Sequence, residues 1–298
     1  MKASSRKLLA LILVLVASVL VAGCSSAEEA VRGKQLKLGN IGWDENVVVA
    51  NLTKVLLQDE LGYDNVQIQQ ADVGPTFQGV GTGDLDAFQD VWLPNHKDYM
   101  SQVQDNVEQL SVWYTDTTEF GLAAPRYMNI SSIDQINSTG VDEITGIEPG
   151  AVITEYIDKY VIPDYGLNVS QRTSSTAAML SELDRKYRNR DPIVFTAWKP
   201  HRMNDDYDFV YLDDPKDSLY PLNRPSQVLT IANQGLRDQH PDAYAFMDSI
   251  RLGENQVVSI ERDIESGTSP EQAARNWIEN NRATVQPWVD AAKRAQGS

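Results

Sequence analysis

The sequence is poor in cysteine, histidine and positive charge. Its 298 residues contain one cysteine, three histidines, and 26 lysines and arginines against 42 acidic residues, which gives a net charge of −16. A single cysteine excludes an internal disulfide framework and a multi-cysteine metal site, and three histidines are too few for a histidine-rich metal centre. The acid excess argues against a nucleic-acid partner, which requires a basic surface. We therefore expect no metal, no cofactor and no nucleic acid.

Recognisable catalytic motifs are also missing. The sequence has no Gly-x-Ser-x-Gly elbow, no phosphate-binding glycine-rich loop and no pair of zinc-protease histidines. The protein is therefore not expected to be an enzyme. Hydrophobic residues make up 42% and charged residues 23%, as in folded globular proteins, and the length suggests about two domains.

The first residues have the features of a bacterial lipoprotein leader. A basic start precedes the apolar run Leu8–Ala22, which is shorter than the roughly 20 residues that a membrane-spanning helix needs. The run ends in Val21-Ala22-Gly23-Cys24, which resembles a lipobox, so Cys24 is predicted to carry the lipid. We expect residues 1–23 to be a signal peptide and 24–35 a tether that holds the protein on the outer face of the cytoplasmic membrane.

Beyond the tether, segments typical of strands and helices alternate. This order indicates an α/β architecture with largely parallel sheets and a helical tail. The predicted strands cover residues 36–41, 66–71, 87–92, 144–147, 193–197 and 228–232. The predicted helices cover residues 47–61, 76–82, 151–160, 177–186, 241–249, 256–265 and 270–296.

Six tryptophans stand out, and three of them follow or end predicted strands, where α/β folds open their ligand clefts. Trp43, Trp92 and Trp198 are expected to be exposed there, whereas Trp277 and Trp288 are assigned to helix packing. A quaternary ammonium group has no N–H to donate, and it binds the faces of aromatic rings. The three indoles therefore suggest an aromatic cage for such a cation.

Six short motifs, in order along the chain, resemble the glycine betaine-binding (OpuAC-like) substrate-binding proteins of bacterial ABC importers. The resemblance runs from about Leu36 to the C-terminus. The motifs are Gly42-Trp43-Asp44, Gly83-Asp84-Leu85-Asp86, Trp92-Leu93-Pro94-Asn95-His96, Thr145-Gly146-Ile147-Glu148-Pro149-Gly150-Ala151, Ser174-Ser175-Thr176-Ala177-Ala178-Met179 and Trp198-Lys199-Pro200-His201.

The resemblance implies a two-lobed periplasmic-binding-protein fold (type II-like) that closes on its ligand. Lobe 1 would comprise residues 36–118 and 228–298, and lobe 2 residues 119–227. By similarity, Trp43, Trp92 and Trp198 would form the cage, and the backbone N–H groups of Val152 and Ile153 would hold the ligand carboxylate. The start of a helix is a suitable site for such an anion. The implied partners are an ABC permease and its ATPase.

Four further residues have more than one interpretation. In the family pattern one residue often separates the Asn and His of the second tryptophan motif, but here His96 follows directly, so it is either a carboxylate contact or a loop residue. Asp44 and Glu45 are interpreted as negative charge at a helix N-terminus, although a carboxylate beside the cage would favour choline. Tyr114 is a candidate for an additional aromatic wall.

Other functions remain open at this stage. The ligand could be carnitine or choline rather than glycine betaine. A lipoprotein sensor with the same fold is a less favoured alternative, and an extracellular enzyme acting on a quaternary amine lacks a nucleophile–base pair.

Overall fold

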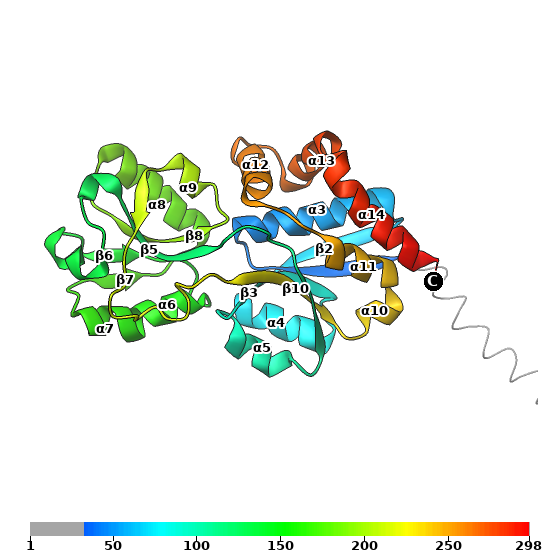
Figure 1. Ribbon diagram of the computed structural model, residues 1–298, viewed down its shortest axis with the longest axis horizontal. Helices are drawn as coiled ribbons and strands as arrows, with labels where there is room; N and C mark the ends of the chain where they lie inside the picture. Colours follow the sequence, from blue (N-terminus) through cyan, green and yellow to red (C-terminus); the bar gives the residue numbers. More distant parts are fainter. Residues whose placement is uncertain (1–32, 298) are drawn as a thin grey trace, which may run out of the picture.

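The computed structural model describes residues 33–297, so the predicted signal peptide and Cys24 lie outside the described residues. The chain forms two five-stranded sheets, each with helices on both of its faces, and the sheets lie at opposite ends of an elongated molecule (Figure 1). We call the part built on the first sheet lobe 1 and the part built on the second sheet lobe 2.

The sheet of lobe 1 has the strand order β2-β1-β3-β10-β4. Strand β1 is parallel to β2 and β3, whereas β10 runs antiparallel to β3 and β4. Strand β3 lies in the centre, and every residue from Ala87 to Trp92 is buried, as expected for a strand covered on both faces. The strands are β1 (Gln35–Asn40), β2 (Asn65–Gln70), β3 (Ala87–Leu93), β4 (Val107–Val112) and β10 (Gln227–Asn233).

The sheet of lobe 2 repeats this arrangement, with the order β7-β6-β8-β5-β9. Strand β6 is parallel to β7 and β8, and β5 runs antiparallel to β8 and β9. The strands are β5 (Glu119–Pro125), β6 (Glu143–Thr145), β7 (Ser170–Arg172), β8 (Val194–Lys199) and β9 (Phe209–Tyr211).

The helices cover the sheets of their own lobes, and the C-terminal helices return to lobe 1 beside α3 (Figure 1). Lobe 1 carries α3 (Asp44–Glu60), α4 (Val73–Thr82), α5 (Lys97–Val103), α10 (Leu236–Gln239), α11 (Pro241–Ser249), α12 (Glu254–Glu265), α13 (Pro270–Asn280) and α14 (Arg282–Gln296). Lobe 2 carries α6 (Val152–Tyr156), which continues through the π-helical turn η3 (Ile157–Val161) into α7 (Ile162–Tyr165), together with α8 (Thr176–Asn189), α9 (Met203–Asp206) and the 3-10 turns η1 (Arg126–Met128) and η2 (Ile133–Ser138).

Two segments connect the lobes, one between β4 and β5 and one between β9 and β10. They are hydrogen-bonded to each other, because the Thr118 hydroxyl donates to the carbonyl of Ser226 (3.2 Å) and accepts from its N–H (2.6 Å). The hydroxyl of Ser226 also donates to Asn95, at 3.2 Å, in the loop after β3. The connection between the lobes is therefore tied to the end of the central strand of lobe 1.

The strands of each sheet run largely in one direction, as predicted, and the exceptions are β10 in lobe 1 and β5 in lobe 2, each of which follows a crossing between the lobes and is antiparallel to both of its neighbours. One expectation about the fold is wrong. The predicted tail helix is two helices, α13 and α14. The break falls at Asn281, whose φ of −128° is not helical. The side-chain amide of Asn281 donates to the carbonyl of Trp277 at 2.8 Å.

This break brings two tail tryptophans together. Trp277 and Trp288 stack with ring centroids 6.5 Å apart and planes within 14°, and both are buried. They pack in the protein interior, as the sequence analysis assigned them.

Candidate ligand-binding site between the two sheets

A glycine places the first cage tryptophan. Gly42 follows β1 with a φ of +88°, which favours glycine, and a Cβ there would lie 2.8 Å from the side-chain amide of Gln70. The turn at Gly42 leads directly into α3. It sets Trp43 at the N-cap of that helix, facing lobe 2.

The other two tryptophans lie on central strands, Trp92 near the end of β3 and Trp198 near the end of β8. The expectation of exposed indoles is wrong. Trp43, Trp92 and Trp198 are only 5%, 3% and 2% exposed, because the two lobes face each other closely enough to cover all three rings.

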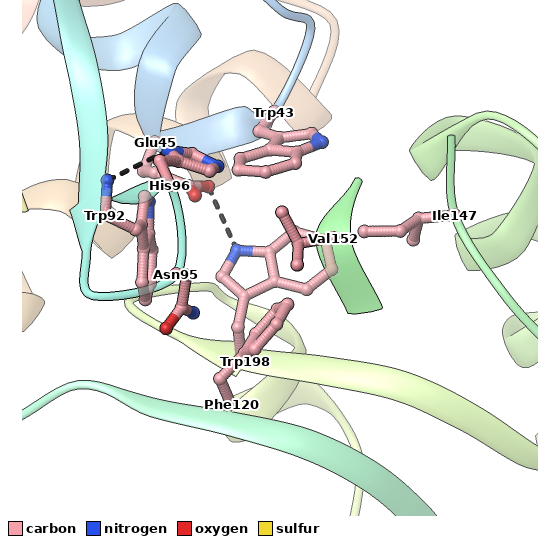
Figure 2. A pocket seen from close by; sticks show the side chains of 9 residues that line it. All are labelled: Trp43, Glu45, Trp92, Asn95, His96, Phe120, Ile147, Val152 and Trp198. Carbon is pink, nitrogen blue, oxygen red and sulfur yellow. Dashed lines mark hydrogen bonds between the residues drawn. The ribbon is translucent and has the colours of Figure 1, made fainter. Parts of the chain in front are cut away.

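The three indoles line one cavity between the lobes (Figure 2). The rings of Trp43 and Trp198 approach across the cleft with centroids 6.4 Å apart and planes tilted by 43°, and Trp92 packs against Phe120 at 6.0 Å. The cavity volume is about 10 Å³, room for about one water molecule, so the rings must move apart to admit a larger group. Nine residues line it: Trp43, Glu45, Trp92, Asn95, His96, Phe120, Ile147, Val152 and Trp198.

Each cage indole donates its N–H to a carboxylate. Trp92 donates to Asp90 (2.8 Å) within β3. Trp198 of lobe 2 donates to Glu45 of lobe 1 (3.0 Å), as Figure 2 shows, and Trp43 of lobe 1 donates to Glu148 of lobe 2 (3.1 Å). Two of the three hydrogen bonds therefore cross the cleft in opposite directions.

Asp90 and Glu148 were not among the residues predicted from the sequence. Asp90 lies two residues before Trp92 on the same face of β3, so the sequence shows an acid beside a cage tryptophan. Glu148 lies inside the motif that begins at Thr145, and its contact with Trp43 depends on the approach of the lobes, which the local pattern does not contain.

Glu45 and Asp90 are buried acids beside the cage, and each keeps one carboxyl oxygen without a hydrogen-bond partner among the described residues. Burial raises the pKa of Asp90 to about 8. Burial, together with the charges of Asp90 and Glu261, also raises the pKa of Glu45 well above its usual range. Glu261 of α12 is buried too, and its pKa is raised to about 6 mainly by burial.

His96 lines the cavity beside Trp43, with ring centroids 5.9 Å apart. Burial lowers its pKa to about 3, so the imidazole is neutral near pH 7. Its Nδ1 accepts the backbone N–H of Trp92 at 3.1 Å (Figure 2). In the neutral ring the proton then lies on Nε2, which is free to serve as a donor.

Val152 and Ile153 begin α6, opposite the indoles. Val152 lines the cavity, whereas the side chain of Ile153 is buried in lobe 2. Their N–H groups belong to the first turn of a helix, which has no intrahelical acceptor for them. The loop before α6 is held to lobe 1 because the Tyr99 hydroxyl donates to the carbonyl of Gly150 at 3.0 Å.

The remaining predicted residues lie outside the cavity lining. Asp44 lies in the first turn of α3 and pairs with Nε2 of His201 across the cleft, at 2.8 Å. Burial acts to raise the pKa of Asp44, but the hydrogen bond and charge of His201 and the charge of Arg202 outweigh it, so the pKa is lowered. Tyr114 is not one of the nine lining residues. It is buried with its ring against Trp113.

Glu45 also lies in the first turn of α3, where the sequence analysis placed it as helix N-terminal charge. The structure adds that its side chain reaches the cavity. Within residues 33–297 no three or more His, Cys, Asp or Glu side chains group to hold a metal ion, and none of the helices there could cross a membrane.

Two lobes with a buried, aromatic cavity between them define a cleft-closing ligand-binding protein. Residues 34–280 match the family described as the substrate binding domain of ABC-type glycine betaine transport systems, OpuAC. The chain belongs to this family.

Known relatives agree with this assignment. The chain is 36% identical over 167 residues to the glycine betaine/carnitine transport binding protein GbuC of Listeria monocytogenes serotype 1/2a (strain 10403S). That alignment covers 55% of this chain and 53% of GbuC, about half the length of this curated relative.

Solved structures have the same two-lobed fold. Lactococcal OpuAC in its closed, liganded conformation with glycine betaine is 30% identical, with a TM-score of 0.79 over 86% of this chain and 99% of that chain. An ABC-transporter choline binding protein in complex with choline is 23% identical, with a TM-score of 0.78 over 88% of this chain and 97% of that chain, a likeness of fold alone.

The buried acids make stability depend on pH. Folded Asp90 keeps its proton up to about pH 8, whereas the unfolded chain releases it near the ordinary value of 3.8, so the free energy of unfolding falls as the pH rises between these values. Asp90→Asn removes this contribution. Relative to the unsubstituted protein, the variant should gain at least ~1.4 kcal/mol between about pH 5 and pH 8, measured by urea unfolding.

The matched control is Asp105→Asn, which removes an exposed carboxylate from the same lobe and should show no such gain. Equal pH dependence in the Asp90→Asn variant and the unsubstituted protein would show that Asp90 is ionised in the folded state.

Proposed function

We propose that this chain is the extracytoplasmic substrate-binding protein of an ABC importer and that it binds glycine betaine or a related betaine. The observation that carries the proposal is the convergence of Trp43, Trp92 and Trp198, from both lobes, on one cavity. Membership of the OpuAC family and the likeness to a neighbour solved with glycine betaine support the same ligand class.

The physical reason is the chemistry of the trimethylammonium group. It carries a positive charge but has no N–H, so a carboxylate alone gives little selectivity for it, whereas an indole face offers negative charge and an apolar surface together. Each such contact contributes about 0.5–2 kcal/mol. Three contacts together with burial of the methyl groups are compatible with micromolar affinity, about −8 kcal/mol.

In this proposal the ligand carboxylate is bound at the other end of the cavity. The N–H groups of Val152 and Ile153 at the start of α6 are the main donors, and the neutral His96 contributes its Nε2 proton. The cation would then contact both lobes and the anion chiefly lobe 2. Closure of the two lobes and ligand binding are thereby coupled.

The proposed organisation follows from the two connecting segments. Lobe 1 would comprise residues 36–118 with 228–298, and lobe 2 residues 119–227. We place the mature protein on the outer face of the cytoplasmic membrane, anchored through Cys24 after removal of residues 1–23, with residues 24–35 as the tether. It would deliver ligand to a permease with an attached ATPase and would catalyse no reaction itself.

Choline is the second candidate ligand, and one observation favours it. The carboxyl group of Glu45 reaches the cavity, and Asp90 lies behind Trp92. A choline hydroxyl could donate to the free oxygen of Glu45, a contact that glycine betaine cannot make. Carnitine, which carries a carboxylate and a hydroxyl, falls between the two.

Trp92→Ala should weaken glycine betaine binding by roughly 30-fold or more, since about 2 kcal/mol of aromatic contact is lost. Trp92→Phe keeps a smaller aromatic face and should lie between the alanine variant and the unsubstituted protein. Isothermal titration calorimetry measures both. Unchanged affinity in Trp92→Ala would exclude Trp92 from the site, and no binding of any betaine or choline at millimolar concentration would refute the proposed function.

A calorimetric comparison decides between the two ligand classes. Because two backbone N–H groups and His96 are placed to bind a carboxylate, glycine betaine should bind at least about tenfold more tightly than choline near pH 7. Tighter binding of choline would instead assign the site to choline, with Glu45 as the hydroxyl acceptor.

A further inference from the structure

The three acids around the cage have one feature in common: each accepts the N–H of a different cage indole. Asp90 holds Trp92, Glu45 holds Trp198 and Glu148 holds Trp43, at 2.8 to 3.1 Å. Indole has one N–H, so a single acceptor fixes how the ring is turned about its side-chain bonds. An ionised carboxylate at that position also repels electron density toward the ring, which makes the indole face more negative, whereas a protonated acid, as Asp90 is below about pH 8, only orients the ring.

Of the three acids, Glu148 is held by the most hydrogen bonds. Its carboxylate accepts the backbone N–H of Thr176 at 2.7 Å and the Thr176 hydroxyl at 3.0 Å, in addition to Trp43. Its own carbonyl accepts from the N–H of Ala151 and from the hydroxyl of Thr154. The acceptor is therefore fixed to the first turn of α8 and to the loop before α6, both in lobe 2.

The arrangement is reciprocal between the lobes. Trp43 of lobe 1 depends on an acid of lobe 2, and Trp198 of lobe 2 depends on an acid of lobe 1. Neither hydrogen bond can form when the lobes are apart. Two of the three indoles consequently receive their orientation only on closure, and Trp43 then also receives the negative charge of Glu148 behind its ring.

We propose that Glu148, Glu45 and Asp90 are positioning residues for the three cage indoles, and that Glu148 makes the cage select a cationic head group over a neutral group of the same shape. The inference rests on the proposed binding of a quaternary ammonium ligand in this cavity. Charge selectivity is assigned to Glu148, which lies across the cleft from Trp43 and accepts its N–H, while Glu45 and Asp90 orient the other two rings.

The test compares two ligands that differ in charge but not in shape. Glycine betaine has a trimethylammonium group, and 3,3-dimethylbutanoate has a neutral tert-butyl group in its place. Glu148→Gln removes the charge and keeps one oxygen that can accept from Trp43, while its NH2 group then faces the N–H of Thr176. It should raise the Kd for glycine betaine about five- to tenfold and change the Kd for 3,3-dimethylbutanoate less than about twofold, by calorimetry.

The matched control is Glu155→Gln, which removes an acid from α6 that is exposed and pairs with Lys159. It should leave both affinities unchanged. Thermal unfolding of each variant confirms that the protein remains folded.

A double-mutant cycle covers the case in which the neutral ligand binds too weakly to measure. Trp43→Phe keeps an aromatic ring without an N–H. If Glu148 acts through that N–H, Glu148→Gln should weaken glycine betaine binding in the unsubstituted protein but change it less than about twofold in the Trp43→Phe background.

Four results separate the hypotheses. Equal loss of both ligands in Glu148→Gln, or an undiminished effect in the Trp43→Phe background, would overturn this inference and leave a purely structural role. Unchanged glycine betaine affinity in Glu148→Gln would overturn it as well. Failure of the unsubstituted protein to bind glycine betaine would instead refute the proposed function.

Discussion

The cleft depends on one constraint: a buried indole needs an acceptor for its N–H. The cage buries three indoles, and lobe 1 supplies an acceptor of its own only for Trp92. The acceptors for Trp43 and Trp198 lie on the opposite lobe. The turn at Gly42, the first turn of α3 and the loop before α6 are all positioned so that these donors and acceptors meet.

A second set of contacts surrounds the cage. Unlike the two cage hydrogen bonds that cross the cleft, these contacts have one direction of charge: lobe 1 contributes the acids and lobe 2 the donors. The backbone N–H of Arg202 donates to Glu261 at 2.7 Å, its guanidinium pairs with Glu265 at 2.8 Å, and His201 pairs with Asp44. The contacts of Glu261 and of His201 are buried or half-buried and are therefore screened less by salt than surface pairs. They favour the closed arrangement while leaving the ligand to complete the centre.

Much of the fold and some of the site could be predicted from the sequence. The strand-like segments and the tryptophans at their ends were visible locally, and the helix Pro241–Ser249 was predicted with its observed bounds. Strand β5 was missed, and the antiparallel direction of β5 and β10 was not predicted, because strand direction is decided by pairing between distant segments. The break at Asn281 was missed because the residues around it keep helical spacing on both sides.

The contacts of the site also depend on residues that are distant in the sequence. Acids next to Trp43 could be seen as helix N-terminal charge, and Asp44 and Glu45 do lie in the first turn of α3. That Glu45 would accept the N–H of Trp198, 153 positions away, follows only from closure of the lobes. The burial of all three indoles likewise arises from the lobes meeting.

The most direct test of the central claim is a crystal structure of this protein with glycine betaine. The account predicts the ammonium nitrogen within about 6 Å of the ring centroids of Trp43, Trp92 and Trp198, with the lobes closed and the carboxylate at the start of α6. A head group bound away from these rings, or contacting only one lobe, would contradict it.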